Sequence, residues 1–524
     1  MTERNTQYTH GLSLPDAFTC GQLFAFSGLD GENSRSLDWC GVLTGNPGEI
    51  RFTSGDSSDD CILLRFTERS DAYDVVLPDL IAAENGGILV TFADAQTIVG
   101  RSDGTPAVRL ESEEYIPGSR SVSAGRYAFC LAVRQTESGV RFALCRRPDA
   151  ASAEADAQTA LQTDADARAK RVLDWYLDVP PCPDAKYEKL WYKCLSVNRA
   201  HVYSPPGDQP LHSTAADRLH GVVRTQDACR HASAMAIYAP EIANDTLLTL
   251  LQCQRADGFI PQTADSGDSA DALYPPMLCA SVWNLFEVTR DTDLLRRTVQ
   301  PLRKYLNWTF RNRRSPNGLM TRHAQGSTVA EEPLESVEYS VLTVYELMCM
   351  QQIYMALGIH TSALETEGIG RELAIRINTR LWDKQTYCYY DRTFGGAFRR
   401  TVKPASFLPL FAGLCDPRQA HLLLQHLTRL LDCPFPLADA VERPQCSVQL
   451  DRNYLVYIGL QRYGFGKQAA ELRRKSLDGV NRLFLKTGTV FACYDPSGGT
   501  PQTEQADAAD SNLTACFTEL FLFG

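Results

Sequence analysis

The sequence predicts a mainly α-helical protein with an N-terminal β-domain, an antiparallel β-sandwich followed by an (α/α)6 toroid. Three observations predict this fold class: short β-like runs before residue 150, an Ala- and acid-rich stretch after it, and helical periodicity beyond residue 172. A chain of 524 residues also exceeds the length at which one hydrophobic core keeps growing. We therefore expect domains at 1–150 and 176–524, joined by a helical linker at 151–175.

The N-terminal region alternates apolar or β-branched runs with clusters of Gly, Asp and Ser, which is typical of strands joined by turns. The runs cover residues 50–53, 61–66, 87–92, 126–133 and 139–145. Their spacing indicates an antiparallel β-sandwich.

The stretch PDAASAEADAQTALQTDADARAK at 148–170 carries almost no large apolar side chains. Its Ala and acidic content indicates a helix that solvent surrounds rather than a segment of a core. We interpret it as the linker between the two domains.

The C-terminal two-thirds has the period of amphipathic helices, interrupted by Gly- and Pro-rich clusters such as DGFIP, SPNGL and YDPSGG. The predicted helices cover residues 184–199, 229–238, 241–255, 272–288, 292–314, 335–357, 363–382, 404–413, 417–431, 448–463, 466–485 and 509–523. Paired helices joined by short loops can close into a double-layered toroid whose inner helices line a cavity.

The composition excludes several classes of function. A net charge of -11 disfavours nucleic-acid binding, because phosphate contacts need clustered Lys and Arg. The chain shows neither a signal-peptide pattern nor an apolar window long enough to span a membrane, so we expect a cytoplasmic protein that does not contact membranes. The 17 cysteines are scattered through apolar segments, which favours buried, reduced thiols.

No cofactor motif is visible, and we expect no cofactor. The histidines that suggest a metal site have no ligand spacing, and we expect no metal. They are His201, His220, His231 and His323.

Six segments of the C-terminal region stand out, in this order: QDACRHASAMAIYAPEIANDTLLTLLQCQRADGFIPQ (226–262), YPPMLCASVW (274–283), SPNGL (315–319), FLPLFAG (407–413), NYLVYIGLQRYG (453–464) and YDPSGG (494–499). Together they resemble the trehalase-like glycosidase superfamily, especially glycoside hydrolase family 63 and the bacterial mannosylglycerate hydrolases. The likeness covers most of residues 180–524, and FAFSGLDG (24–31) is similar to the β-domain that accompanies some such toroids. The resemblance implies a toroid that hydrolyses a glycosidic bond with two carboxyl groups, one donating a proton and one activating water.

The sequence departs from this family at both catalytic positions. The family's acid, an Asp in a loop after the NGL element, has no equivalent here, and the acidic residues nearby are Glu331, Glu332 and Glu335. The family's base, a Glu two residues before a Tyr, is replaced by Ala492. We predict that one of the three glutamates donates the proton, against the alternative that they are solvated first-turn charges.

A substitute base is harder to place. Glu504, Asp507 and Asp510 follow YDPSGG in an acidic stretch that could reach the mouth of the toroid, although a solvated loop is the simpler interpretation.

The ligand-binding candidates follow from the same alignment of motifs. Asp227 lies among cations at a predicted helix start, where it serves either as a sugar ligand or as an N-cap. The family's Trp is replaced by Gln at positions 226 and 449, which exchanges apolar contact for hydrogen-bonding capacity and implies a different ligand or a lost one. The predicted substrate-binding residues are Arg224, Asp227, His231, Asp257, Gln262, Gln449, Asn453 and Tyr494.

Asp257 and Asn453 have structural alternatives, a turn and a helix cap respectively. We expect a small carbohydrate ligand, and the sequence leaves a homo-oligomer open. The leading hypothesis is a glycosidase that acts on a small glycoside by acid–base hydrolysis. Two alternatives remain: a phosphorolytic sugar enzyme, and a catalytically inactive protein that binds carbohydrate.

Overall fold

The chain is helix-rich, with antiparallel sheets in its N-terminal part, as predicted. The computed structural model describes residues 23–32, 40–43, 48–53, 61–66, 75–83, 87–110, 113–115, 121–124, 127–204, 213–214, 223–263, 277–323, 333–438, 448–498 and 511–524. Internal contacts divide the chain into two units. The first comprises Met1–Val222, Asn481–Phe491 and Thr503–Ala515, and the second comprises Val223–Val480, Ala492–Gln502 and Cys516–Gly524.

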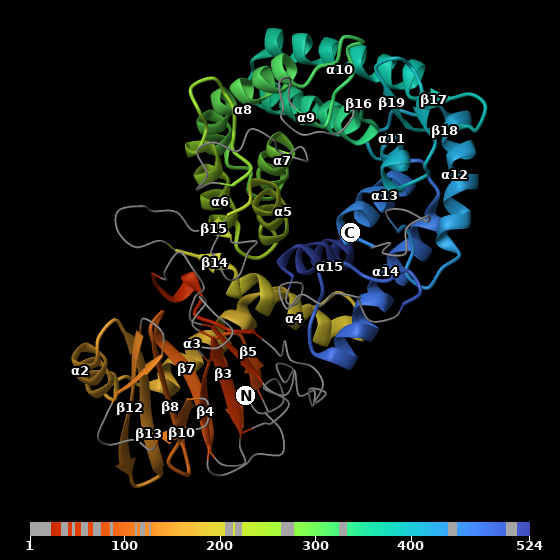
Figure 1. The fold of residues 1–524 in the computed structure, drawn as a ribbon. Helices are drawn as coiled ribbons and strands as arrows, with labels where there is room; N and C mark the ends of the chain where they lie inside the picture. The colour runs from red at the N-terminus through yellow and green to blue at the C-terminus, as the bar shows by residue number, and fades with distance from the viewer. Residues whose placement is uncertain are drawn as a thin grey trace. The chain divides into compact units, whose positions relative to one another are not determined.

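Two antiparallel sheets form the β-part of the first unit (Figure 1). One has the strand order β1(Leu23–Phe24), β2(Cys40–Leu43), β3(Glu49–Thr53), β4(Cys61–Arg65), β9(Ala107–Leu110), β10(Glu113–Tyr115). The other has the order β11(Val122–Ala124), β12(Tyr127–Thr136), β13(Gly139–Arg147), β8(Thr97–Ser102), β7(Ile88–Asp94), β6(Leu80–Ala83), β5(Val75–Leu77). The five runs predicted from the sequence correspond to β3, β4, β7, β12 and β13.

Side chains from both sheets share one hydrophobic core. In β3 the alternation is clear, because Ile50 and Phe52 are buried while Arg51 between them is not. Phe24 of β1 meets Phe92 of β7 with ring centroids 4.7 Å apart, which joins one sheet to the other. Each such buried side chain contributes about 1.5–3 kcal/mol to folding.

The predicted linker is helical but not fully solvated. It forms α2(Ala150–Ala160) and α3(Ala165–Asp178), which begin at the N-caps Asp149 and Asp164. Ala153 and Ala157 of α2 are fully buried, and α2 packs on β12 and β13. Small side chains let the helix lie close to the sheet, so the low content of large apolar residues does not indicate solvation here.

Every predicted helical segment contains a helix. The first predicted segment, 184–199, corresponds to α4(Glu188–Ala200) in the first unit. That unit also has the short strands β14(Val202–Tyr203) and β15(Ser213–Thr214). The remaining segments correspond to α5(Thr225–Met235), α6(Pro240–Gln252), α7(Leu278–Thr289), α8(Thr292–Asn312), α9(Val337–Ala356), α10(His360–Arg380), α11(Leu408–Phe411), α12(Pro417–Leu431), α13(Leu450–Arg462), α14(Gly466–Thr487) and α15(Asn512–Phe523).

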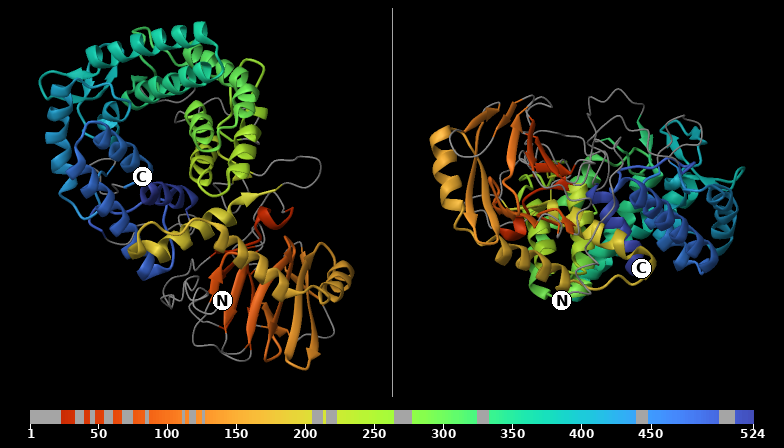
Figure 2. Two further views of the ribbon diagram at one scale, coloured as in Figure 1. Left: turned by 180° about the vertical axis from the view of Figure 1, so that it is seen from behind. Right: turned by 90° about the horizontal axis from the view of Figure 1, so that it is seen from below.

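The helices of the second unit lie in two rows (Figures 1 and 2). In the inner row each helix packs on the next odd-numbered one, from α5 to α7, α9, α11 and α13. The even-numbered helices lie outside them, and α5, α7 and α9 pack against the partners α6, α8 and α10 that follow them in the chain. Successive inner helices run in the same direction, because an outer helix that runs the opposite way lies between them in the chain. The N-terminal ends of the inner helices therefore lie on the same side of the row.

The last helix contacts both ends of the inner row. Phe517 and Phe521 of α15 lie with their ring centroids 5.6 and 5.3 Å from that of Tyr454 in α13. The guanidinium of Arg230 in α5 stands 5.7 Å from the ring of Phe517. The same α15 thus touches the first and the last of the other inner helices.

A buried carboxyl group fixes the start of α7. The side chain of Glu346, in α9, accepts hydrogen bonds from the backbone N–H groups of Cys279 and Ala280 at 3.0 and 2.9 Å. The N-cap residue of α7, Met277, has a φ of 55° and no capping side chain, so Glu346 supplies the cap from a neighbouring helix. Burial raises the pKa of Glu346 to about 7, although these N–H groups oppose the shift.

Close packing of α13 on α11 depends on Gly459. A Cβ atom at this position would lie 2.7 Å from the backbone nitrogen of Phe411 and 2.9 Å from the carbonyl carbon of Leu410. The two helices can therefore approach at this distance only because residue 459 has no side chain.

In the part of the chain that the structure describes, every helix is too short or too polar to cross a membrane.

Candidate active site

Three acidic side chains occupy the first turns of three inner helices of the second unit. Asp227 belongs to α5, Glu338 to α9 and Asp451 to α13. The partial positive charge of a helix N-terminus favours carboxylates at such positions. Because the inner helices have their N-terminal ends on one side, these carboxyl groups belong to one region of the unit.

Arg230 connects α5 to α13. Its Nη2 lies 2.8 Å from Oδ2 of Asp451, and its Nη1 lies 4.0 Å from Oδ1 of Asp227. With its amide oxygen turned toward the guanidinium, Gln226 accepts from Arg230 at 2.7 Å. Arg230 is 14% exposed, so the pair with Asp451 is largely shielded from water.

Arg452 makes the equivalent connection from α13 to α9. Its Nε lies 3.5 Å from Oε1 of Glu338, and it donates a short hydrogen bond to Oε1 of Gln449. Gln226 and Gln449, which stand where the resembled family has Trp, each hydrogen-bond an arginine of this region. We refer to Asp227, Arg230, Asp451, Arg452 and Glu338 as the carboxylate–arginine chain.

The three carboxyl groups differ in their tendency to ionise. Burial raises the pKa of Asp227 above its usual range, against the opposing effect of Arg230 and Arg224. Burial likewise raises the pKa of Glu338, with Arg452 opposing. Burial also acts on Asp451, but Arg230 and Arg452 outweigh it and lower the pKa of this group. One site therefore holds two carboxyl groups whose pKa is raised beside one whose pKa is lowered.

Two further predicted ligands lie beside Asp227. Arg224 is the exposed N-cap residue of α5, and it forms an isolated β-bridge with Thr263. The carbonyl oxygen of Gln262 accepts from the backbone N–H of Thr225 at 2.9 Å. The structure thus brings Arg224, Asp227 and Gln262 together at the start of α5.

Asp257 has a different environment. Its side chain is 47% exposed, lies 3.0 Å from Arg255 and accepts from the backbone N–H of Phe259 at 3.1 Å. Burial is the largest single effect and raises the pKa of Asp257, but the bonds to Phe259 and Arg255 together outweigh it and lower the pKa. These bonds are the contacts of a turn, which is the structural alternative for this residue.

Three of the predicted ligands are buried. His231 is 0% exposed, and Tyr494 stacks on Phe435 with ring centroids 4.8 Å apart. The amide of Asn453 donates to the carbonyl of Pro436 at 3.1 Å and to Oγ of Ser476 at 3.3 Å, which joins α13 to α14.

Of the predicted proton donors, only Glu335 lies among the described residues. Glu331 and Glu332 fall outside them, as do Glu504, Asp507 and Asp510. Glu335 belongs to β16(Leu334–Glu335) in a small sheet with β19(Asp391–Thr393) and β20(Phe398–Arg399). Its side chain is 0% exposed, and its Oε1 accepts from Oγ of Ser315 at 2.8 Å.

Sequence reasoning missed Glu338, Asp451 and Arg452. A signal for them was present, because an acidic residue occurs in the first turn of every fourth helix, at 227, 338 and 451. In a repeating hairpin architecture, equivalent positions of alternate helices meet at one end. The pairing of the two glutamines with arginines had no signal, since it depends on contacts between distant helices.

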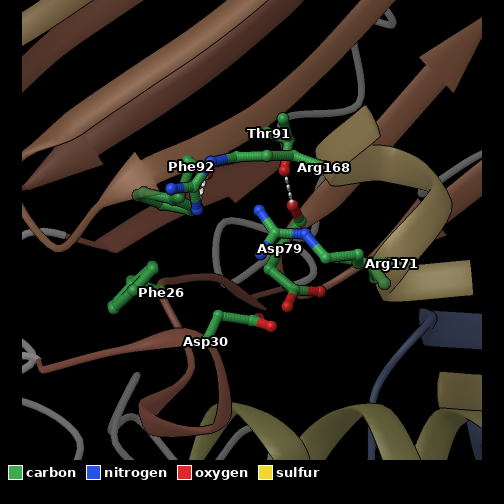
Figure 3. A pocket seen from close by; sticks show the side chains of 8 residues that line it. Phe26, Asp30, Asp79, Thr91, Phe92, Arg168 and Arg171 are labelled. Carbon is green, nitrogen blue, oxygen red and sulfur yellow. Dashed lines mark hydrogen bonds between the residues drawn. The ribbon is translucent and has the colours of Figure 1, made fainter. Parts of the chain in front are cut away.

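The first unit holds a separate pocket (Figure 3), and two carboxyl groups that line it, Asp30 and Asp79, pair with a buried arginine. Arg199 of α4 is 1% exposed and reaches Oδ2 of Asp79 at 3.0 Å and Oδ2 of Asp30 at 2.5 Å. Burial raises the pKa of Asp79 to about 7, with Arg199 opposing and Asp30 adding to the shift. The pocket is lined by Phe26, Asp30, Asp79, Thr91, Phe92, Arg168, Arg171 and Val172.

Comparison with known proteins identifies relatives of the second unit. Residues 224–338 match the family described as mannosylglycerate hydrolase MGH1-like glycoside hydrolase domain. Mannosylglycerate hydrolase MGH1 of Selaginella moellendorffii is 32% identical over 114 residues, which are 20% of this chain and 22% of that protein. The chain thus matches about a fifth of the length of this curated relative.

Solved structures share the fold over longer stretches. The glycoside hydrolase family 63 mannosylglycerate hydrolase from Thermus thermophilus, in complex with glucose, covers 64% of this chain and 99% of its own, with a TM-score of 0.52 and 19% identity. A bacterial glucoamylase complexed with acarbose covers 98% of this chain and 94% of its own, with a TM-score of 0.61 and 12% identity. The predicted resemblance is therefore confirmed: the chain is similar to the MGH1-like glycoside hydrolases in the sequence of residues 224–338, and to six-hairpin glycosidases in fold.

Proposed function

We propose that the chain hydrolyses the O-glycosidic bond of a small glycoside or oligosaccharide by acid–base catalysis, at the first turns of α5, α9 and α13. The carboxylate–arginine chain is the observation that carries this proposal. Hydrolysis of this kind needs one carboxyl group that donates a proton and another that stays ionised. The opposite pKa shifts of the carboxyl groups in this site support such a division of roles, because burial raises the pKa of Asp227 and Glu338 while two arginines lower that of Asp451.

The proposed architecture is a closed (α/α)6 toroid in residues 176–524, preceded by a β-sandwich in residues 1–150 and the helical stretch 151–175. The contacts of α15 with both α13 and α5 support a closed inner ring. The core shared by the two N-terminal sheets supports the sandwich. In such a toroid the carboxylate–arginine chain would line one mouth of the central hollow.

In this proposal the sugar ring binds against Arg224, Asp227, Gln262 and Gln449. The proton donor comes from the acidic segment between residues 331 and 338. In the resembled family, Trp side chains at the positions of Gln226 and Gln449 can cover the apolar face of a sugar ring. In this chain, the two glutamines place amides there that are hydrogen-bonded to arginines. A ligand rich in hydroxyl groups fits this polar wall better than one held by stacking.

The proposal is tested by incubating the whole chain with mannosylglycerate, trehalose, maltooligosaccharides and a panel of simple alkyl glycosides. We expect release of reducing sugar from at least one of them. Asp227→Asn should lower kcat/KM by about 100-fold or more, because it removes a carboxyl group from the site. Asp257→Asn, which alters an exposed turn, should leave kcat/KM within about 2-fold.

Other outcomes separate the alternatives. Turnover that requires inorganic phosphate would identify a phosphorolytic enzyme. A rise in melting temperature with a sugar, but without turnover of any glycoside, would identify a binding protein.

A further inference from the structure

We propose that Glu338 is the catalytic proton donor of this site, an inference that rests on the proposed glycosidase function. Glu338 is the second residue of α9, and its side chain is 14% exposed. A proton donor must be reachable by the substrate and yet shielded enough to hold its proton near neutral pH. Of the two carboxyl groups that the structure describes between residues 333 and 338, Glu338 is largely shielded but still partly exposed, whereas Glu335 is fully buried.

The backbone that carries Glu338 is held in place from several sides. Oγ of Ser336 caps α9 by accepting from the N–H of Tyr339 at 3.3 Å. The N–H of Val337 donates to Oδ1 of Asp391 at 2.8 Å, and Oδ2 of Asp391 lies 2.6 Å from Nζ of Lys403. A fixed helix start matters because a displacement of about 1 Å can cost 100-fold in rate.

The charges that face Glu338 come from three directions. Arg452 and Asp451 belong to α13, Lys403 precedes α11, and Arg322 lies in the loop before β16. The nearest, Arg452, stands 3.5 Å from Oε1, beyond the 2.7–2.9 Å typical of a tight charge-assisted hydrogen bond. The contact with Arg452 is therefore looser than a tight ion pair, and the guanidinium is close enough to stabilise the carboxylate once a proton has left.

In the step we assign to it, Glu338 transfers its proton to the glycosidic oxygen while the bond from that oxygen to the anomeric carbon breaks. The electron pair of the broken bond stays on the leaving oxygen, which departs as an alcohol. A water molecule attacks the anomeric carbon and gives its proton to a second carboxylate. Exchange with solvent then returns both carboxyl groups to their starting states.

The neighbouring carboxyl groups suit this role less well. Glu335 is fully buried and bonded to Ser315. Asp451 is paired with Arg230 at 2.8 Å, which keeps it ionised. Asp227 lies between Arg230 and the exposed Arg224, an arrangement suited to sugar hydroxyl groups.

The test compares two substrates that carry the same sugar, an alkyl glycoside and a glycosyl fluoride. An alkoxide needs a proton to leave, whereas fluoride leaves without one. We expect Glu338→Gln to lower kcat/KM by about 100-fold or more on the alkyl glycoside and by less than about 10-fold on the fluoride. Glu335→Gln is the matched control, and its effect should be the same on both substrates.

An equal loss on both substrates, or no loss on the alkyl glycoside, overturns the assignment of Glu338 while the proposed function stands. Failure of the wild-type protein to cleave either substrate, for every sugar tested, overturns the proposed function and this inference with it. If Glu338→Gln does not fold, Glu338→Asp gives the same comparison, because it keeps the proton but shortens the side chain. A larger loss on the alkyl glycoside than on the fluoride supports the assignment.

Discussion

Each unit buries arginine–carboxylate contacts, but to different depths. In the first unit, Arg199 and Asp79 are 1% and 2% exposed, and water has almost no access to the pair. In the second unit, the side chains of Asp227 and Glu338 remain 20% and 14% exposed. The other partner of Arg199, Asp30, is 25% exposed, so the contrast concerns the pair of Arg199 with Asp79. A fully buried pair stabilises the fold, whereas a partly exposed one can exchange a partner for a ligand. We therefore expect the Arg199–Asp79 pair to serve stability and the carboxylate–arginine chain to serve the proposed catalysis.

The contribution of the fully buried pair to stability is tested most directly by removing Arg199. Arg199→Met leaves Asp79 and Asp30 without their buried cation, and we expect the free energy of unfolding to fall by about 3–5 kcal/mol. Urea unfolding followed by the fluorescence of Trp175, which lies 4.8 Å from the guanidinium, measures the loss. As a control, Arg371→Met removes an exposed partner of Glu367 and should change the free energy by less than about 1 kcal/mol. Similar losses in both variants would contradict the distinction.

Glu346 is a buried carboxyl group that accepts its hydrogen bonds from backbone N–H groups, and it offers a second test of burial. Glu346 has a folded-state pKa of about 7, above its ordinary 4.5, so the folded protein binds its proton more tightly than the unfolded chain does. Its contribution to stability is therefore complete below pH 4.5 and is lost as the pH rises through about 7. Between these pH values the free energy of unfolding should fall by about 3 kcal/mol more in the wild type than in Glu346→Gln. Parallel curves for the two proteins would contradict this prediction.

The smallest expected effect concerns Asn453. If this residue serves only to join α13 to α14, Asn453→Ala should lower the free energy of unfolding by about 1–3 kcal/mol and leave KM unchanged. Denaturant unfolding and steady-state kinetics on the same preparation separate the two roles. A large rise in KM with little loss of stability would restore Asn453 as a sugar ligand.

The sequence predicted the positions of the elements well. The five strand segments and the helical segments each correspond to an element, because periodicity and turn residues are local signals. The linker shows the limit of this reasoning. Its composition indicated helix correctly, but whether Ala153 and Ala157 face solvent or a sheet depends on contacts that composition does not contain.

The candidate site was predicted less completely. Asp227, Arg224 and Gln262 were named from the sequence, and the structure places them together at the start of α5. Glu338 and Asp451 were missed, because the resemblance directed attention to a loop and to Ala492 rather than to the first turns of α9 and α13. Residues far apart in sequence form this site, so no single motif describes it.

Gly459 also bears on the position of charged groups elsewhere in α13. The missing side chain sets the separation of α13 and α11. Two turns toward the N-terminus, α13 carries Asp451 and Arg452. A single added methyl group at 459 would act as a spacer that pushes α13 away from α11 and carries both charged groups with it. A substitution at this glycine would thus move two members of the carboxylate–arginine chain without replacing either of them.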